Sequence, residues 1–136
     1  MASHKVTTIW KGDSIFESDN PNETKLIVGS DHIDAFSPKA LMLSSLAGCS
    51  GIDIVDLCKK MRVPLDDFKM EITANLTDEH PRYYDKVSVD YHFYGTDLNK
   101  NKIQKAVDLS VDKYCGVMEM FRKFSDVTTN IYLHKK

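Results

Sequence analysis

The sequence predicts an α+β fold, with a largely antiparallel sheet and one long, buried central helix. Strand-like segments follow one another in consecutive pairs joined by short turns, whereas a parallel α/β sheet would alternate strands with helices. One helical segment, residues 38–62, carries apolar or small side chains on every face over its first half, and such a helix must be covered by protein. With 136 residues, the chain is expected to form a single domain, residues 1–136.

The first third of the chain has the pattern of an antiparallel meander. Side chains alternate over residues 5–10, residues 12–13 form a turn signal, and residues 14–18 can return as a second strand. Another turn is predicted at residues 19–22, before a short strand at residues 25–28. We therefore expect three strands before the first helix.

The central helix is predicted to begin at Ser37 and Pro38, because a hydroxyl at the N-cap and a proline in the first turn are typical helix starts. It ends before Pro64, since proline cannot continue a helix. Beyond Gly51 the pattern becomes amphipathic. Gly48 and Gly51 indicate either a kink or the close approach of another chain segment.

A hairpin, two helices and a last strand follow. Apolar side chains occupy every second position in residues 68–76 and again in residues 87–93, which predicts two half-buried strands. Helical spacing predicts a helix over about residues 98–114 and a shorter one over residues 115–123, before a strand at residues 127–133. The expected order is therefore β-β-β-α-β-β-α-α-β.

Composition and charge argue against several function classes. The 18 Lys and Arg residues are balanced by 20 Asp and Glu residues, so the whole chain has no attraction to nucleic acid. The longest stretch without a charge, residues 40–52, is too short to span a bilayer, and residues 1–13 contain no apolar signal core. Motifs for nucleotide or zinc binding are absent. We expect a cytoplasmic protein with no cofactor, no metal, no nucleic-acid partner and no membrane partner.

The candidate reactive groups are three cysteines, Cys49, Cys58 and Cys115. Their odd number and wide spacing suit a reducing cytosol. Cys58 lies about half a turn round the helix from Cys49 and roughly 13 Å along it, so these two cannot form a disulfide. If a pair exists, it is Cys49 with Cys115. All three can also be small buried hydrophobic residues, which is our interpretation of Cys58.

Local sequence gives Cys49 and Cys115 different expected environments. Small neighbours on both sides of Cys49 leave room for a ligand at its sulfur. Cys115 opens the last helical segment, where unpaired N–H groups favour a thiolate. Asp53 and Asp56 lie on roughly the same helix face as Cys49 and either tune a thiol or form an exposed polar stripe. Residues 31–34, Asp-His-Ile-Asp, are interpreted as a capping loop rather than a metal site.

In the two cysteine segments, the chain resembles the OsmC/Ohr family, named for osmotically inducible protein C and organic hydroperoxide resistance protein. The resemblance rests on SPKALMLSSLAGCSGIDIVDLCKKMR at residues 37–62 and on VDKYCGVMEMF at residues 111–121. The family carries one cysteine on its long central helix and a second near the start of a later helix, and these match Cys49 and Cys115. The strand order also matches, so the resemblance implies an OsmC-like fold and an intertwined homodimer with composite sites at its interface.

This resemblance implies a thiol-dependent peroxidase that reduces organic hydroperoxides in oxidative stress defence, with Cys49 and Cys115 as catalytic residues. Cys49 would attack the peroxide and become a sulfenic acid. Cys115 would then condense with it to a redox-active disulfide, and a dithiol reductant of unknown identity would restore both thiols.

One part of the family pattern is missing from this sequence. Family members place an arginine from the N-terminal strands opposite the first cysteine, held by a glutamate just after the helix-opening proline. Here Pro38 is followed by lysine and alanine, and no arginine precedes the central helix. Lys11 or Lys25 can supply positive charge, although lysine lacks the planar fork of arginine. The alternative is an OsmC-like redox-sensing or small-molecule-binding protein without fast peroxidase activity.

Overall fold

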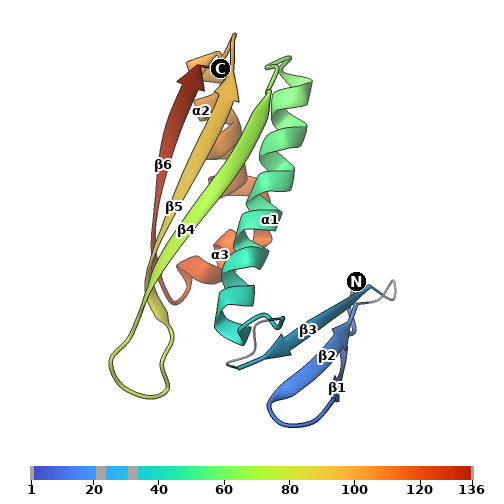
Figure 1. The fold of residues 1–136 in the computed structure, drawn as a ribbon. Helices are drawn as coiled ribbons and strands as arrows, with labels where there is room; N and C mark the ends of the chain where they lie inside the picture. Colours follow the sequence, from blue (N-terminus) through green and yellow to red (C-terminus); the bar gives the residue numbers. More distant parts are fainter. Residues whose placement is uncertain (1, 21–23, 31–33, 136) are drawn as a thin grey trace. The chain divides into compact units, whose positions relative to one another are not determined.

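The chain folds into two compact units, Met1–Ser44 and Ser45–Lys136 (Figure 1). The computed structural model describes residues 2–20, 24–30 and 34–135. The elements follow one another in the predicted order β-β-β-α-β-β-α-α-β, with one π-helical turn added between the last two helices. The α+β class is confirmed, and the assignment of residues 1–136 to a single domain stays a prediction.

The smaller unit is a three-stranded antiparallel sheet. Its strands β1 (Thr7–Trp10), β2 (Ile15–Asp19) and β3 (Lys25–Gly29) pair in the order β1-β2-β3, as the sequence predicts. Gly12 and Asp13 form the first turn with positive φ values of 108° and 46°, a backbone region that glycine and aspartate tolerate best. The predicted turn at residues 19–22 and the capping loop at residues 31–34 lie partly outside the described residues.

The larger unit is built on a second three-stranded sheet. Strands β4 (Asp67–Leu76) and β5 (Tyr84–Gly95) form the predicted antiparallel hairpin. Strand β6 (Asp126–Lys135) instead pairs in parallel with β5. The parallel pairing was not predicted from the sequence. It is possible because the helices between β5 and β6 form a long crossover that returns the chain to the end of the sheet where β5 began.

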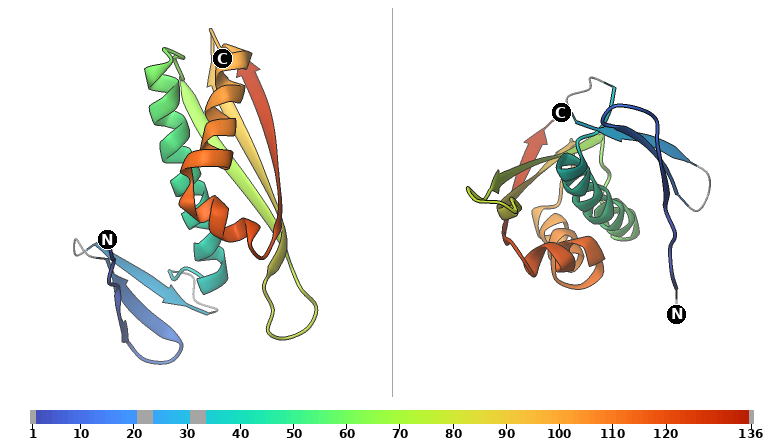
Figure 2. Two further views of the ribbon diagram at one scale, coloured as in Figure 1. Left: turned by 180° about the vertical axis from the view of Figure 1, so that it is seen from behind. Right: turned by 90° about the horizontal axis from the view of Figure 1, so that it is seen from below.

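Three helical segments connect β5 to β6. Helix α2 (Lys100–Leu109) is capped by the Asn99 side chain, which accepts a hydrogen bond from the amide of Lys102. A π-helical turn, η1 (Ser110–Tyr114), occupies the last part of the segment predicted as one regular helix, and α3 (Gly116–Arg122) follows. The larger unit's helices all lie against the same face of its sheet (Figure 2).

That face of the sheet carries the core of the larger unit. Every second residue of β5 points inward and is buried, as the predicted alternation requires: Val87, Val89, Tyr91 and Phe93. Helix α1 (Pro38–Lys60) crosses close to the sheet at Gly51, where a Cβ atom would lie 2.5 Å from Cε of Met70. At Gly48 a Cβ atom would meet nothing within 4 Å. The sequence left a kink or the close approach of another chain segment open for these glycines, and at Gly51 the structure shows the close approach of β4.

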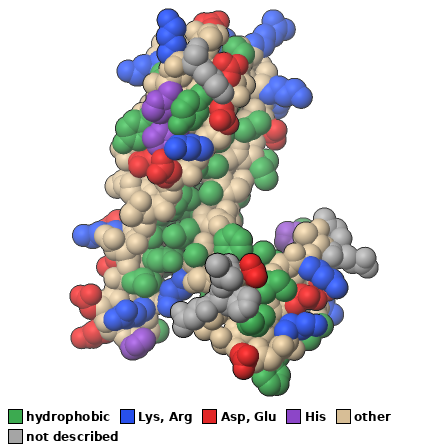
Figure 3. All heavy atoms as spheres, in the orientation of Figure 1, with side chains coloured by type: hydrophobic (Ala, Val, Ile, Leu, Met, Phe, Trp, Pro, Cys, Tyr) green, Lys and Arg blue, Asp and Glu red, His purple; other side chains and the backbone are tan. Residues whose placement is uncertain are grey.

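Helix α1 buries one stripe and leaves another apolar stripe uncovered. The buried stripe contains Leu46, Ser50, Gly51, Ile54 and Cys58. On the uncovered side, Ile52 is 66% exposed and Val55 is 47% exposed. Hydrophobic side chains gather along this helix and the neighbouring strand β4 (Figure 3). By length and hydropathy alone α1 could also cross a membrane, a test that the core helices of other proteins pass as well.

Candidate functional site

Cys49 lies on α1, at the border between the buried and the exposed sides of the helix. The next residue, Ser50, is fully buried, whereas the preceding residue, Gly48, is exposed. Cys49 itself is half-buried and has no disulfide partner. Helical periodicity therefore gives this thiol contact both with the core of the larger unit and with its surface.

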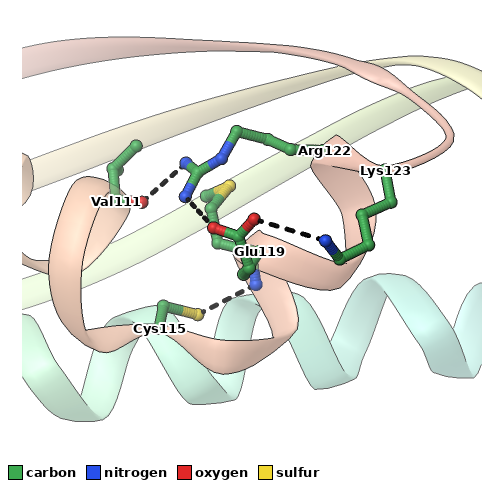
Figure 4. A network of polar contacts seen from close by, with 6 residues as sticks. Val111, Cys115, Glu119, Arg122 and Lys123 are labelled. Carbon is green, nitrogen blue, oxygen red and sulfur yellow. Dashed lines mark hydrogen bonds and ion pairs between the residues drawn. The ribbon is translucent and has the colours of Figure 1, made fainter.

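Cys115 occupies the junction between the π-helical turn and α3. Its amide donates a hydrogen bond of 2.9 Å to the carbonyl of Ser110, which closes the π turn. Its sulfur accepts a hydrogen bond of 3.3 Å from the amide of Met118, so Cys115 is the N-cap of α3 (Figure 4). The side chain is only 3% exposed. Because π turns often mark functional sites, this local geometry singles out Cys115.

The structure brings the two predicted site cysteines together. The thiol of Cys115 lies close enough to the thiol of Cys49 for their interaction to raise its pKa, although 65 residues separate them in the chain. Both are free thiols. The pair combines one half-buried cysteine with one buried cysteine, an arrangement in which oxidation of the first can be followed by disulfide formation with the second.

Cys115 is held as a neutral thiol, which corrects the expectation that its helix position favours a thiolate. The pKa of Cys115 is raised to about 12, mainly by burial and also by the interaction with the Cys49 thiol, while the hydrogen bond from the Met118 amide acts in the opposite direction. The nearby carboxylate of Asp53 also disfavours the thiolate. Helix α3 has only seven residues, and its N-terminal amides do not offset the loss of solvent around the sulfur.

Cys58 is separate from this pair, as predicted. It is 1% exposed, and burial raises the pKa of its thiol. It lies on the buried stripe of α1 and packs as a small hydrophobic residue.

Sequence reasoning missed a buried hydrogen-bond network beside the two thiols. The hydroxyl of Ser50 is 2.7 Å from the hydroxyl of Tyr91 and 2.9 Å from that of Ser110. Ser110 also donates to a carboxylate oxygen of Asp53 at 3.2 Å. The three hydroxyl-bearing residues are fully buried. No pattern in the sequence singles out these three residues, because serine and tyrosine occur in every environment.

The arginine drawn beside Cys115 in Figure 4 is bonded to groups other than the two cysteines. Arg122 donates to the carbonyl of Val111 at 2.6 Å and to Glu119 at 3.1 Å, which ties α3 to the π turn (Figure 4). In the smaller unit, Lys25 is paired with Glu17 at 3.6 Å. Whether Lys11 or Lys25 replaces the missing arginine stays a prediction.

Residues of α1 and β4 line a shallow apolar hollow of about 380 Å³, and Gly48, the residue before Cys49, is one of them. Its lining includes Gly48 and Ile52 from α1 and Phe68 and Met70 from β4. The hollow presents almost no polar surface, so it suits an alkyl or aryl group rather than a charged one. Among the described residues, no group of three or more His, Cys, Asp or Glu side chains is arranged to hold a metal ion.

Comparison with known proteins gives consistent matches in sequence and in structure. The sequence model of a family described as OsmC-like protein matches residues 29–130. Protein YhfA of Escherichia coli strain K12 is 33% identical over 103 residues, which are 76% of this chain and 77% of YhfA.

Two solved structures have the same fold. The crystal structure of a hypothetical protein from Aquifex aeolicus VF5 matches with a TM-score of 0.91 and 24% identity, over 100% of this chain and 99% of that chain. The organic hydroperoxide resistance protein OsmC from Legionella pneumophila matches with a TM-score of 0.71 and 18% identity, over 97% of this chain and 98% of that chain.

Proposed function

The chain belongs to the family of OsmC-like proteins, and from this premise we propose that it is a thiol-dependent peroxidase that reduces organic hydroperoxides in oxidative stress defence. Cys49 is the residue proposed to attack the peroxide, and Cys115 is proposed to resolve the oxidised product. The observation that carries the proposal is the proximity of these two thiols, close enough for Cys49 to raise the pKa of Cys115.

The first step oxidises Cys49. Its thiolate attacks the terminal oxygen of the hydroperoxide, so that a sulfur–oxygen bond forms and the oxygen–oxygen bond breaks. The alkoxide leaves and takes up a proton to become an alcohol, while Cys49 becomes a sulfenic acid. The half-buried position of Cys49 supports this role, because the attacking sulfur must be reachable from the surface.

The second step forms the disulfide and the third removes it. The Cys115 sulfur attacks the sulfenic sulfur, the sulfur–oxygen bond breaks, and hydroxide leaves as water with the proton of Cys115. An external dithiol then reduces the disulfide by two successive exchanges. Burial of Cys115 beside Cys49 supports the resolving role, since the sulfur that must find the sulfenic acid is already in contact with it.

The proposed substrate class is based on the apolar hollow whose lining includes Gly48, the residue before Cys49. A surface with almost no polar lining favours a hydroperoxide with an alkyl or aryl group over hydrogen peroxide. The uncovered apolar side of α1 supports association into a homodimer, and the odd number and wide spacing of the cysteines suit the proposed cytoplasmic location.

Stopped-flow oxidation with cumene hydroperoxide tests the proposal. Wild-type protein is expected to consume one equivalent rapidly, Cys49→Ser to show only the background rate, and Cys115→Ser to accumulate a sulfenic acid that dimedone traps. Cys58→Ala is the matched control and is expected to behave as wild type. Equal consumption by wild type and Cys49→Ser would falsify the peroxidase proposal.

A redox-sensing or small-molecule-binding role is the second candidate. The observation that favours it is the lack of an arginine before α1, together with Lys39 and Ala40 after the helix-opening proline. A sensor would form the disulfide once per oxidation but would turn over slowly in excess hydroperoxide and dithiol. Measuring both single-turnover oxidation and steady-state turnover separates the two roles.

A further inference from the structure

The two cysteine-bearing segments are joined by buried hydroxyl groups. Ser50 follows Cys49 on α1, and its hydroxyl lies 2.9 Å from that of Ser110, 60 residues further along the chain. Ser110 also donates weakly to the carbonyl of Ser50, at 3.3 Å. The carbonyl of Ser110 in turn accepts a hydrogen bond of 2.9 Å from the amide of Cys115. A short hydrogen-bonded connection therefore runs from the backbone beside one cysteine to the backbone of the other.

Two further side chains form hydrogen bonds with the two serine hydroxyls of this connection. Tyr91 reaches from β5 to the Ser50 hydroxyl at 2.7 Å, and Asp53 accepts from Ser110 at 3.2 Å. The hydroxyls of Ser50, Tyr91 and Ser110 are fully buried, and every buried side-chain polar atom among the described residues has a partner. Buried hydroxyls are costly without partners, so losing one member leaves the others unsatisfied and shifts the segments they join.

The network occupies positions whose neighbours on the same helix faces are mainly apolar. Ser50 and Ser110 lie on helix faces whose other members are mainly apolar, such as Ile54 on α1 and Val107 on α2. Hydrophobic contacts are non-directional, whereas hydrogen bonds of 2.7 to 3.2 Å fix both distance and angle. A directional link is needed only if the relative position of α1 and η1 must be held closely.

We propose that Ser50, Ser110 and Asp53 are positioning residues that hold Cys115 where its sulfur can form the disulfide with Cys49. This inference rests on the proposed function and names how its second step is achieved. The step itself forms the sulfur–sulfur bond and breaks the sulfur–oxygen bond of the sulfenic acid, and water leaves with the proton of Cys115. The network contributes by raising the effective concentration of one thiol at the other.

Charge is a separate contribution of the same network. The ionisable groups around Cys115 are Cys49 and Asp53 from α1 and Tyr91 from β5. Tyr91 is buried, which raises its pKa, so its hydroxyl stays neutral. Burial is the largest cause of the raised pKa of Cys115, and the negative charge of Asp53 makes a smaller contribution in the same direction. Replacing this carboxylate by an amide separates charge from positioning, because the amide oxygen can still accept from Ser110.

Equilibration with reduced and oxidised glutathione tests the inference without any peroxide. In a Cys58→Ala background, Ser110→Ala is expected to lower the equilibrium constant for forming the Cys49–Cys115 disulfide about tenfold, which is about 30 mV in reduction potential. Asp53→Ala is expected to lower this equilibrium constant severalfold. In Asp53→Asn the constant is expected to stay within about twofold of the parent value, because the hydrogen bond from Ser110 is kept. Ser88→Ala and Asp108→Ala, outside the network, are the matched controls.

A purely structural role for the network gives a different result. Ser110→Ala would then lower the free energy of unfolding of the reduced protein but leave the glutathione equilibrium of the folded protein unchanged, and this outcome would overturn the inference. If Ser110→Ala does not fold, the two Asp53 variants provide the test. An equal decrease of the disulfide equilibrium constant in Asp53→Ala and Asp53→Asn would contradict the positioning role. The test and the peroxide-consumption assay can fail independently, because the glutathione equilibrium does not involve peroxide.

Discussion

At the residue scale, the two thiols of the site differ in burial and therefore in availability. Cys49 is half-buried, while Cys115 is 3% exposed and surrounded by core residues such as Met118. An oxidant from solution reaches the first sulfur before the second. The order of events that the proposed mechanism requires, oxidation at Cys49 and resolution by Cys115, thus follows from where α1 and η1 place their side chains.

The raised pKa of Cys115 predicts how stability depends on pH. The thiol ionises near its ordinary pKa of 9.0 in the unfolded chain and near about 12 in the folded protein. The unfolded state therefore loses its proton first, and the free energy of unfolding of the reduced protein falls as pH rises from about 9 toward 12, by at most about 1.4 kcal/mol per pH unit for each such group. Cys58 and Tyr91 shift in the same direction.

Urea unfolding of the reduced protein between pH 8 and pH 10.5 measures this dependence. The expected result is a smaller loss of stability for Cys115→Ala than for wild type over that range, because one of the groups that ionises only on unfolding has been removed. The same slope in both proteins would contradict the raised pKa of Cys115.

Cys58 gives the matching prediction for a cysteine outside the site. Cys58→Ala removes one buried sulfur and is expected to cost about 1 kcal/mol of stability through lost packing. It should leave the rate of disulfide formation between Cys49 and Cys115 unchanged. Thermal unfolding measures the first effect and thiol titration after oxidation measures the second. A failure of Cys58→Ala to form the disulfide would place Cys58 in the redox chemistry.

At the scale of the element, local patterns predicted most of the structure. Alternation identified β4 and β5, and the Ser37–Pro38 start with the Pro64 stop identified α1. The π-helical turn at η1 could not be predicted, because it is stabilised by Arg122 and by tertiary contacts of Ser110. The parallel pairing of β6 likewise depends on how the crossover packs rather than on the residues of β6 itself.

The candidate site also combines features that local sequence predicts with features that depend on tertiary contacts. The positions of Cys49 and Cys115 followed from motif-like local sequence, and their contact followed from the family fold that the motifs implied. The network of Ser50, Tyr91 and Ser110 could not be predicted, because serine and tyrosine are common in every environment. Only the folded chain shows that these three hydroxyls meet.

The cap of α2 provides a prediction for a single element. Asn99 accepts from the amide of Lys102 at 3.1 Å, which satisfies one of the unpaired amides of the first turn. Asn99→Ala is expected to cost about 1 kcal/mol in the free energy of unfolding, and Asn99→Asp to cost little. Asn101→Ala, within the same helix, is the control and should be neutral or stabilising, because alanine is the better helix former. Urea denaturation distinguishes these outcomes, and an equal loss in both alanine variants would argue against the cap.

At the scale of the whole molecule, both units leave apolar side chains in solvent. In the smaller unit Trp10 is 64% exposed and Ile9 is 53% exposed, and in the larger unit Ile52 is 66% exposed. In the smaller unit's strands, Gly29 alone is fully buried, so its sheet has no core of its own. Sheets of this size are not stable without a packed face. The proposed homodimer would cover these surfaces with a second copy of the chain.

The single tryptophan makes the dimer measurable. We expect the wild-type protein to sediment as a dimer at micromolar concentration, with Trp10 emission shifted to the blue because the ring is shielded from water. Ile52→Asp places a charge on the uncovered apolar stripe of α1 and is expected to weaken association at least tenfold, since burying an unpaired charge in an interface is costly. Lys59→Asp, at the exposed end of the same helix, is the control for added negative charge. A wild-type chain that sediments as a monomer, with the emission of a solvated tryptophan, would contradict the dimer and leave the apolar stripe of α1 to another partner.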